Sequence, residues 1–535
     1  MGPPVLPWWF SLTGRDGCMP ARRNSLRFVS VQCPATGHDP LQGTTRMSRH
    51  QGGWRSARFV APVPQHPRFD ATPMASPVAP AAPAAPAGRA ARLRSAAALG
   101  EHDDGTIRSL FKNGNWSLSF VGVLAYVYAA VTYGLPIVGP SVVIALLGLA
   151  FERTRIVVPP FLFMFSLYVA WAAAGYSTSL MQKETWDQLV VLAKVFVISF
   201  VIVNVTRDAW RVRMFVMFFL ACFAAYPVRG VLINYFIVGY TWFGRALWNF
   251  IYNNSNDLAA LTFFPLSLAI HAAISEKPGW LKKAALVGVA VLPLVILLTQ
   301  SRGALIALVV SGLIFYIVHA SGKRVKSLLW AIAVSILIVP FVPDSAWERF
   351  GGMTALTSAT TVKDADPEGS AEARYNIWRV ARVMISEYPV SGVGLGAYPT
   401  AHATYAPRVG VPAASQGFKD THSTYLNVAA ETGVPGLVLF MAMILTVLIP
   451  AEVTRRKVRG TQRSTQLLTL ELGVLAFLLA GIFGSFAKLS FLYIQLAITW
   501  AVTDLARRER AAGTLPVARS SGVTAVRNPR SRRGR

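Results

Sequence analysis

One histidine of this chain occupies a position that suits proton transfer. His422 follows a polar stretch, residues 419–421, and begins an apolar stretch that leads to Glu431. A neutral imidazole can take a proton from an attacking hydroxyl near neutral pH. An isolated histidine is more often structural, but the polar and glycine-rich surroundings of His422 favour a general base. For Glu431 we favour a structural role, such as orienting a partner side chain or capping a helix end.

Arginines at the edges of apolar segments are the second group of candidate functional residues. Arg302 lies between two strongly apolar runs, with the small residues Ser301 and Gly303 beside it. A guanidinium there is costly unless it is hydrated or paired, and its fork matches the oxygens of a phosphate group. The pattern predicts a phosphate clamp. The alternative is an anchor whose charged end reaches water.

Arg245 is a candidate for a second phosphate ligand. It precedes the polar cluster Asn253–Asp257, which leads directly into another apolar run. We expect Ser255 or Asn256 to cap the helix that starts there. The residues alone leave open whether Arg245 binds phosphate.

Other chemical signatures are weak or missing from the sequence. Asp364 and Asp366 form a DxD, which we interpret as part of a solvated loop, and neither HExxH nor GxSxG occurs. Cys18, Cys33 and Cys222 give neither a paired framework nor metal-ligand spacing. We therefore predict no metal, no cofactor and no serine hydrolase chemistry.

The composition of the chain indicates that these residues belong to a membrane protein. Hydrophobic residues make up 53% of the chain and charged residues only 14%, against about 25% charged in soluble domains. Apolar runs long enough to cross a bilayer recur along the chain. We predict an all-α polytopic membrane protein with about twelve spans, at residues 117–133, 136–151, 157–174, 187–205, 213–228, 257–274, 284–299, 303–319, 327–343, 435–451, 466–484 and 489–504.

The distribution of positive charge predicts the topology. Arginine and lysine are abundant in some loops and in the tails, whereas the other short loops are nearly bare. The rich loops do not all fall on one side when the twelve spans strictly alternate, so the contrast between rich and bare loops is the signal we use. We expect both termini in the cytoplasm and a large periplasmic loop, residues 343–433, between spans nine and ten. The net charge of +27 then reflects topology and no nucleic-acid partner.

Both tails are expected to be disordered. Residues 1–110 are rich in Pro, Ala and Arg, and the basic residues 506–535 also contain no apolar run. We suspect that translation starts later, for example at Met74, so that residues 1–73 are not part of the natural protein. The membrane domain is expected to span residues 116–505.

The large loop contains a predicted helix over residues 372–387. Arg374 lies on its apolar side and can point back toward the membrane domain, whereas Arg379 and Arg382 face away. We expect the apolar stripe to pack on the membrane domain or to lie at the interface, and Pro389 to end the helix. Four residues form the stripe at i, i+3, i+4 and i+7: Ile377, Val380, Ala381 and Met384.

Three glycines, Gly392, Gly394 and Gly396, follow this helix. Neither a preceding strand nor a Walker lysine accompanies them, so the pattern does not indicate a nucleotide site. We interpret them as a tight turn whose backbone packs closely beneath a lid.

With these residues in view, the chain resembles the O-antigen ligase superfamily of bacterial inner-membrane proteins. That superfamily includes O-antigen ligases, O-antigen polymerases and protein O-oligosaccharyltransferases. The cluster Asn253–Asp257 is similar to a subgroup of O-glycosylation ligases found beside exosortase systems. The main resemblance is carried by three segments: Gln300–Gly303, Trp378 with Tyr388–Gly396, and His422–Leu426 with Glu431–Gly433.

The resemblance implies a metal-independent, GT-C-like transferase. The donor would be a glycan on undecaprenyl pyrophosphate in the outer leaflet, and the acceptor a hydroxyl of a lipid, a glycan or a protein. His422 would act as the base, with Glu431 and Tyr425 in supporting positions. Charge neutralisation of the leaving pyrophosphate would fall to three arginines: Arg302, Arg245 and Arg374.

Several functions remain open at the level of sequence. The same transfer gives a ligase, an O-antigen or exopolysaccharide polymerase, or a protein O-oligosaccharyltransferase, depending on the acceptor. A small-solute transporter, such as a bicarbonate transporter, is the more distant alternative. Transporters often show inverted repeats and charges at mid-bilayer, whereas the unusual charges here lie at the edges of apolar runs.

Overall fold

The computed structural model describes residues 114–152, 155–319, 324–351 and 370–515, together with Arg108 and Phe111. Three sequence predictions fall outside the described residues. They concern the N-terminal tail, the C-terminal tail beyond residue 515, and the pair Asp364 and Asp366.

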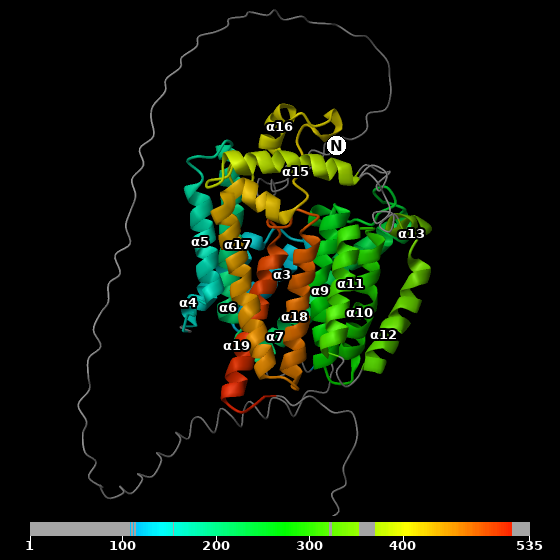
Figure 1. Ribbon diagram of the computed structural model, residues 1–535. Helices are drawn as coiled ribbons and strands as arrows, with labels where there is room; N and C mark the ends of the chain where they lie inside the picture. Colours follow the sequence, from blue (N-terminus) through cyan, green and yellow to red (C-terminus); the bar gives the residue numbers. More distant parts are fainter. Residues whose placement is uncertain are drawn as a thin grey trace, which may run out of the picture. The chain divides into compact units, whose positions relative to one another are not determined.

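The described residues form helices and contain no β-strand (Figure 1). In chain order the named helices of the described residues begin with α3 (Leu118–Thr132), α4 (Val138–Phe151), α5 (Pro160–Ala174), α6 (Gln182–Val205), α7 (Ala209–Phe223) and α8 (Arg229–Ile233). They are followed by α9 (Ser255–Ser275), α10 (Trp280–Leu298), α11 (Arg302–His319), α12 (Arg324–Ile338) and α13 (Asp344–Gly351). The last are α15 (Ser370–Glu387), α16 (Tyr398–Val409), α17 (Thr424–Lys457), α18 (Gln462–Ala480) and α19 (Ser490–Ala511).

Each apolar segment expected to span the membrane coincides with one of these helices. Among the described residues, 7 helical segments are long and apolar enough to cross a bilayer: Gln182–Val205, Ala209–Val238, Ser255–Ser275, Trp280–Leu298, Arg302–His319, Thr424–Lys457 and Gln462–Ala480. The all-α polytopic class is therefore confirmed. The total of about twelve spans stays a prediction, because α3, α4, α5 and the segment Ile332–Phe341 are shorter apolar helices and α19 is not among the candidate spans.

The first two helices form the tight hairpin that the short link at residues 133–137 requires. Tyr133 ends α3 in a left-handed conformation, with φ of 53°. Small residues then allow close helix contact: a Cβ at Gly122 would lie 2.6 Å from the backbone nitrogen of Ala145. The pair packs as a unit against α6 and α7.

One end of the helices gathers the basic loops, and we name it the basic end. Arg213 forms an ion pair with Glu276 at 2.6 Å, and Arg463 forms one with Glu509 at 2.6 Å. Arg508 donates to the carbonyl of Arg207 at 2.6 Å. These contacts join α7 to the residue after α9, α18 to the last turns of α19, and α19 to the link between α6 and α7, so the adjoining loops rich in positive charge lie at a common end.

A cap of residues 370–421 covers the opposite end (Figure 1). Helix α15 lies across the helix ends and packs on α17 and α16. Its apolar stripe is buried, with Ile377, Val380, Ala381 and Met384 at most 3% exposed, but it packs mainly on other residues of the cap and not, as expected, on the membrane domain. The stripe packs against Tyr398, Ala401 and Tyr405 of α16, so the cap has a small core of its own.

Candidate active site

The turn between α10 and α11 brings two predicted arginines to the same place. Ala246 donates its backbone N–H to the carbonyl of Leu298 at 2.9 Å, and the Gln300 amide donates to the carbonyl of Gly244 at 3.0 Å. The backbone of Gln300 is left-handed, with φ of 51°. This reversal lets α11 begin at once at Arg302, beside the loop that carries Arg245.

Arg245 is held in a fixed orientation. Its Nε donates to the carbonyl of Thr299 at 2.8 Å, and its Nη2 donates to Oδ1 of Asn256 at 2.7 Å. The prediction that Ser255 or Asn256 caps α9 is wrong. The N-cap is Asn254, whose side chain accepts from the backbone N–H of Asn256 at 2.8 Å. The short Asn254 side chain reaches back to the first turn, which leaves the Asn256 side chain directed at the arginine.

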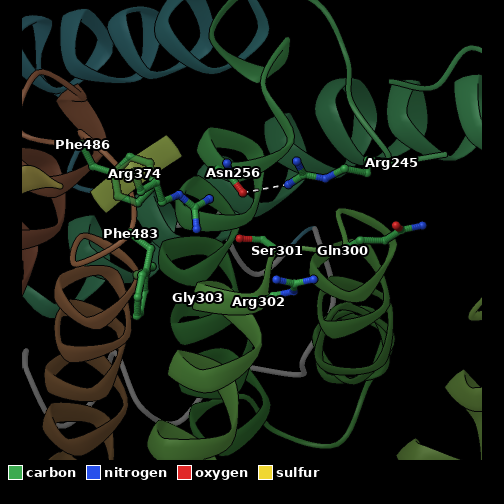
Figure 2. Close-up of a pocket in the computed structure, with 10 residues that line it drawn as sticks. Arg245, Asn256, Gln300, Ser301, Arg302, Gly303, Arg374, Phe483 and Phe486 are labelled. Atoms are coloured by element: carbon green, nitrogen blue, oxygen red, sulfur yellow. Dashed lines mark hydrogen bonds between the residues drawn. The ribbon is translucent and has the colours of Figure 1, made fainter. Parts of the chain in front are cut away.

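A pocket of about 400 Å³ lies where these elements meet. Figure 2 shows Arg374 reaching in from one side and Arg245 from the other, with Ser301 and Arg302 between them. The three arginines predicted to bind pyrophosphate thus line one pocket, although they are far apart in the chain. None of the described residues that line the pocket is acidic, and the full lining is Arg245, Asn256, Gln300, Ser301, Arg302, Gly303, Arg374, Ala480, Phe483 and Phe486.

The start of α11 adds a further positive contribution. The first N–H groups of a helix and its dipole favour an anion, and α11 begins at Arg302 in the wall of the pocket. Close packing requires the neighbouring glycine, since a Cβ on Gly303 would lie 2.7 Å from the ring of Phe483. Three cations and a helix N-terminus make this pocket suitable for a multiply charged anion.

Helix α15 connects the pocket to the histidine loop. Arg374, in its first turns, lines the pocket. Trp378, one turn later, donates its indole N–H to the carbonyl of Thr421 at 3.0 Å. The cap helix therefore fixes Arg374 of the pocket and the residue before His422 at the same time.

His422 lies in a loop that is bound to the pocket wall. Thr424 donates its backbone N–H to the carbonyl of Gly481 at 2.7 Å, and its hydroxyl donates to the carbonyl of Gly484 at 2.7 Å. Phe486, which lines the pocket, donates its backbone N–H to the same hydroxyl at 2.9 Å. The half-buried His422 adopts φ of 50° and directly precedes Ser423, the N-cap of α17.

The predicted supporting residues lie outside this pocket. Glu431 is 1% exposed, and its Oε1 accepts from Lys488 at 3.0 Å and from Asn427 at 3.1 Å. Tyr425 donates its hydroxyl to the carbonyl of Leu478 at 2.8 Å. Tyr425 thus binds the backbone near the end of α18, whereas Glu431 is bound by two side chains. Neither residue lines the arginine pocket, and His422 is also absent from its lining.

A second pocket, of about 390 Å³, lies between α5, α6, α17 and α19. Its wall is mainly apolar. Asn427 and Glu431 of α17 and Lys488, in the segment before α19, contribute polar groups to it. The short segment 481–489 contributes to both pockets, through Phe483 and Phe486 on one and Lys488 on the other.

The three glycines after α15 form a tight turn that docks on α17. All have positive φ, from 67° to 113°. Val393 donates its N–H to the carbonyl of Ala430 at 2.8 Å, and Gly394 donates to that of Glu431 at 3.0 Å. α17 kinks at Gly433, whose φ is 72°, so the two irregular segments pair with each other beneath the cap.

A second histidine of the cap has a structural environment. His402 is fully buried, and its Nδ1 lies 2.8 Å from the carbonyl of Gly417. Burial lowers the pKa of His402, which favours the neutral ring. In the part of the chain that the structure describes, no three His, Cys, Asp or Glu side chains gather as a metal site would need.

The comparisons with known proteins agree with this geometry. Residues 287–441 match the family model described as O-antigen ligase. The match runs from α10 into α17, and so includes Arg302, Arg374 and His422, while Arg245 lies before it. No curated protein matches the chain. The match supports the predicted resemblance to the O-antigen ligase superfamily and a glycan-transferring function, and the chain is a membrane protein with an O-antigen ligase domain. The similarity to the exosortase-associated subgroup stays a prediction.

Proposed function

We propose that the protein transfers a glycan from a polyprenyl pyrophosphate, such as undecaprenyl pyrophosphate, to an acceptor hydroxyl at the periplasmic face of the bacterial inner membrane. One observation carries the proposal: Arg245, Arg302 and Arg374 line a single pocket, and its wall anchors the loop of His422. The guanidinium groups and the N-terminus of α11 supply the charge that a pyrophosphate needs.

In the proposed reaction the acceptor oxygen attacks the anomeric carbon of the donor sugar. The new bond between oxygen and carbon forms as the bond from that carbon to the phosphate oxygen breaks, and the pyrophosphate leaves with the electron pair. His422 takes the proton of the acceptor hydroxyl. The arginines stabilise the charge that develops on the leaving pyrophosphate. Attack from the side opposite the leaving group inverts the anomeric carbon, and no step requires a metal or a cofactor.

The location of the pocket suits a lipid-linked donor. Arg302 starts an apolar helix of 18 residues, so its guanidinium lies at the level where a span ends. A donor lipid can place its pyrophosphate there while its chain stays in the bilayer. The cap, residues 370–421, covers this end and would exclude water from the reacting groups. The charges also lie at helix ends and not at mid-bilayer, which favours a transferase over a solute transporter.

The experiment that tests the proposal compares glycans in a deletion strain. The strain is complemented with wild type, with His422→Ala or with an empty vector, and lipid-linked glycan pools and surface glycans are measured. We expect His422→Ala to behave like the empty vector, with a lipid-linked glycan accumulating and one surface glycoconjugate missing. An unchanged glycan profile in the deletion strain would contradict the proposal.

The identity of the missing product would name the acceptor. Loss of a glycolipid indicates a ligase, loss of long polymer with retention of single repeats indicates a polymerase, and loss of a glycoprotein indicates a protein O-oligosaccharyltransferase. Immunodetection of each variant in the membrane fraction controls for expression.

A further inference from the structure

A continuous set of hydrogen bonds leads from the segment before α19 to the residue before His422. Lys488 donates from Nζ to Oε1 of Glu431 at 3.0 Å. Asn427 donates from Nδ2 to the same Oε1 at 3.1 Å and to Oγ1 of Thr421 at 3.2 Å. We call these four residues, Lys488, Glu431, Asn427 and Thr421, the polar relay.

The polar relay is buried at its centre. Thr421, Asn427 and Glu431 are each at most 1% exposed, whereas the side chain of Lys488 is 33% exposed. A carboxylate removed from water is costly unless partners satisfy it. Glu431 is satisfied by one ammonium and one amide, so removal of either partner leaves a buried charge with too few donors.

The backbone next to the relay needs support. His422 has φ of 50°, a left-handed conformation that costs a residue with a Cβ about 1–2 kcal/mol. Thr421 is therefore held on both sides: the Trp378 indole binds its carbonyl at 3.0 Å, and Asn427 binds its hydroxyl. Because both the carbonyl and the side chain of Thr421 are held, the direction of the backbone that continues into His422 is fixed.

We propose that Asn427, Glu431 and Lys488 are positioning residues that set the orientation of His422 through Thr421. This inference rests on the proposed function, in which His422 is the general base. It explains why an ion pair with a buried carboxylate lies beside an active site without facing the phosphate pocket. None of the three touches the reacting atoms, so their loss is expected to reduce turnover and to leave donor binding intact.

The test uses purified full-length protein, a polyprenyl-pyrophosphate-linked glycan and its acceptor. Asn427→Asp keeps the size of the side chain, and its carboxylate can still accept from the Thr421 hydroxyl, but it cannot donate to Glu431 and places a second carboxylate against it. Repulsion between the two carboxylates is expected to displace residue 427 and, with it, Thr421. We expect kcat to fall roughly 30- to 100-fold, the range for a base displaced by about 1 Å, with little change in the donor KM. The matched control is Arg456→Met, which removes an exposed ion pair with Glu452 near the far end of α17 and should keep wild-type kcat.

A second variant provides the rescue. Glu431→Gln added to Asn427→Asp reverses the polarity of the pair, because the new amide donates to the new carboxylate, which also accepts from the Thr421 hydroxyl and faces Lys488. We expect the double variant to recover about tenfold or more of the lost kcat at unchanged KM. The Tm of each variant is also measured, because a gain in kcat that only follows a gain in Tm would reflect restored folding and not restored positioning of His422.

The outcomes distinguish the relay from the proposed function. Wild-type kcat in Asn427→Asp, or equal loss of donor binding and kcat, would overturn the positioning role while His422→Ala remains inactive. An active His422→Ala would overturn the catalytic role of His422 itself, and with it the purpose of the relay.

Discussion

At the scale of single residues, the proposed binding of pyrophosphate depends on the shape of the guanidinium as much as on its charge. Arg302 lies at the start of α11, where the helix N-terminus and two other arginines face the same pocket. A guanidinium can bind two oxygens of one phosphate at once, whereas an ammonium is a point charge. Shape and charge can therefore be separated by two substitutions at this position.

We predict that Arg302→Ala abolishes transfer and that Arg302→Lys keeps only a small part of it. Hydrogen bonds to charged groups contribute about 1.5–3 kcal/mol each, so loss of one of two bonds should weaken donor binding roughly tenfold or more. Donor affinity of the purified variants checks this prediction. Full affinity in Arg302→Lys would show that charge alone suffices.

We predict a smaller effect for Asn256→Ala. The substitution removes the acceptor that orients Arg245, at 2.7 Å, but leaves the bond from Arg245 to the Thr299 carbonyl in place. Donor affinity should fall about three- to tenfold, with kcat little changed. Measuring KM and kcat with the purified variant decides, and a selective loss of kcat would argue against orientation of Arg245 as the role of Asn256.

At the scale of elements, the glycine turn after α15 holds the cap onto α17. Gly394 has φ of 113°, and a Cβ there would clash with the Ser179 hydroxyl. Leu180 also donates its N–H to the carbonyl of Val393 at 3.0 Å, so the turn contacts the loop before α6 as well as α17. Displacement of this turn would move α15, which carries both Arg374 and Trp378.

We predict that Gly394→Ala destabilises the protein by about 2–4 kcal/mol, from backbone strain together with overpacking. The matched control is Gly410→Ala. Gly410 also has a positive φ, of 70°, but open space around it, so the substitution should cost only about 1 kcal/mol. Thermal unfolding in detergent compares the two, and equal destabilisation would mean that close packing at Gly394 is unimportant.

The sequence predicted these elements better than it predicted their contacts. The apolar stripe of residues 377–384 and the glycine turn follow from local periodicity and backbone preference, and both are confirmed. The cap of α9 was assigned to Ser255 or Asn256 instead of Asn254, because adjacent polar residues at a helix start can exchange roles. The bonds of Trp378 and Asn427 to Thr421 depend on the kink of α17 and the placement of α15, which no local pattern specifies.

At the scale of the whole molecule, charge separates the two ends of the helices. The basic end gathers ion pairs such as Arg213 with Glu276 and Arg463 with Glu509. The cap and the phosphate pocket lie at the opposite end. If the basic end faces the cytoplasm, as the positive-inside rule predicts, the pocket faces the periplasm.

We predict that a cysteine in the cap is labelled from outside intact inner membranes and that one at the basic end is not. Suitable exposed sites are Ser386 on α15 and Arg459 between α17 and α18. The background replaces the three native cysteines. Labelling with a membrane-impermeant maleimide before and after permeabilisation gives the result, and early labelling at Arg459→Cys would reverse the topology.

The most direct test of the central claim measures donor binding and turnover together in purified His422→Ala. The account predicts that turnover falls roughly 10²- to 10⁴-fold, the usual contribution of a general base, while the arginine pocket still binds the polyprenyl-pyrophosphate-linked donor with affinity close to wild type. Wild-type turnover, or a loss of donor binding that matches the loss of turnover, would contradict the assignment of His422 as the base.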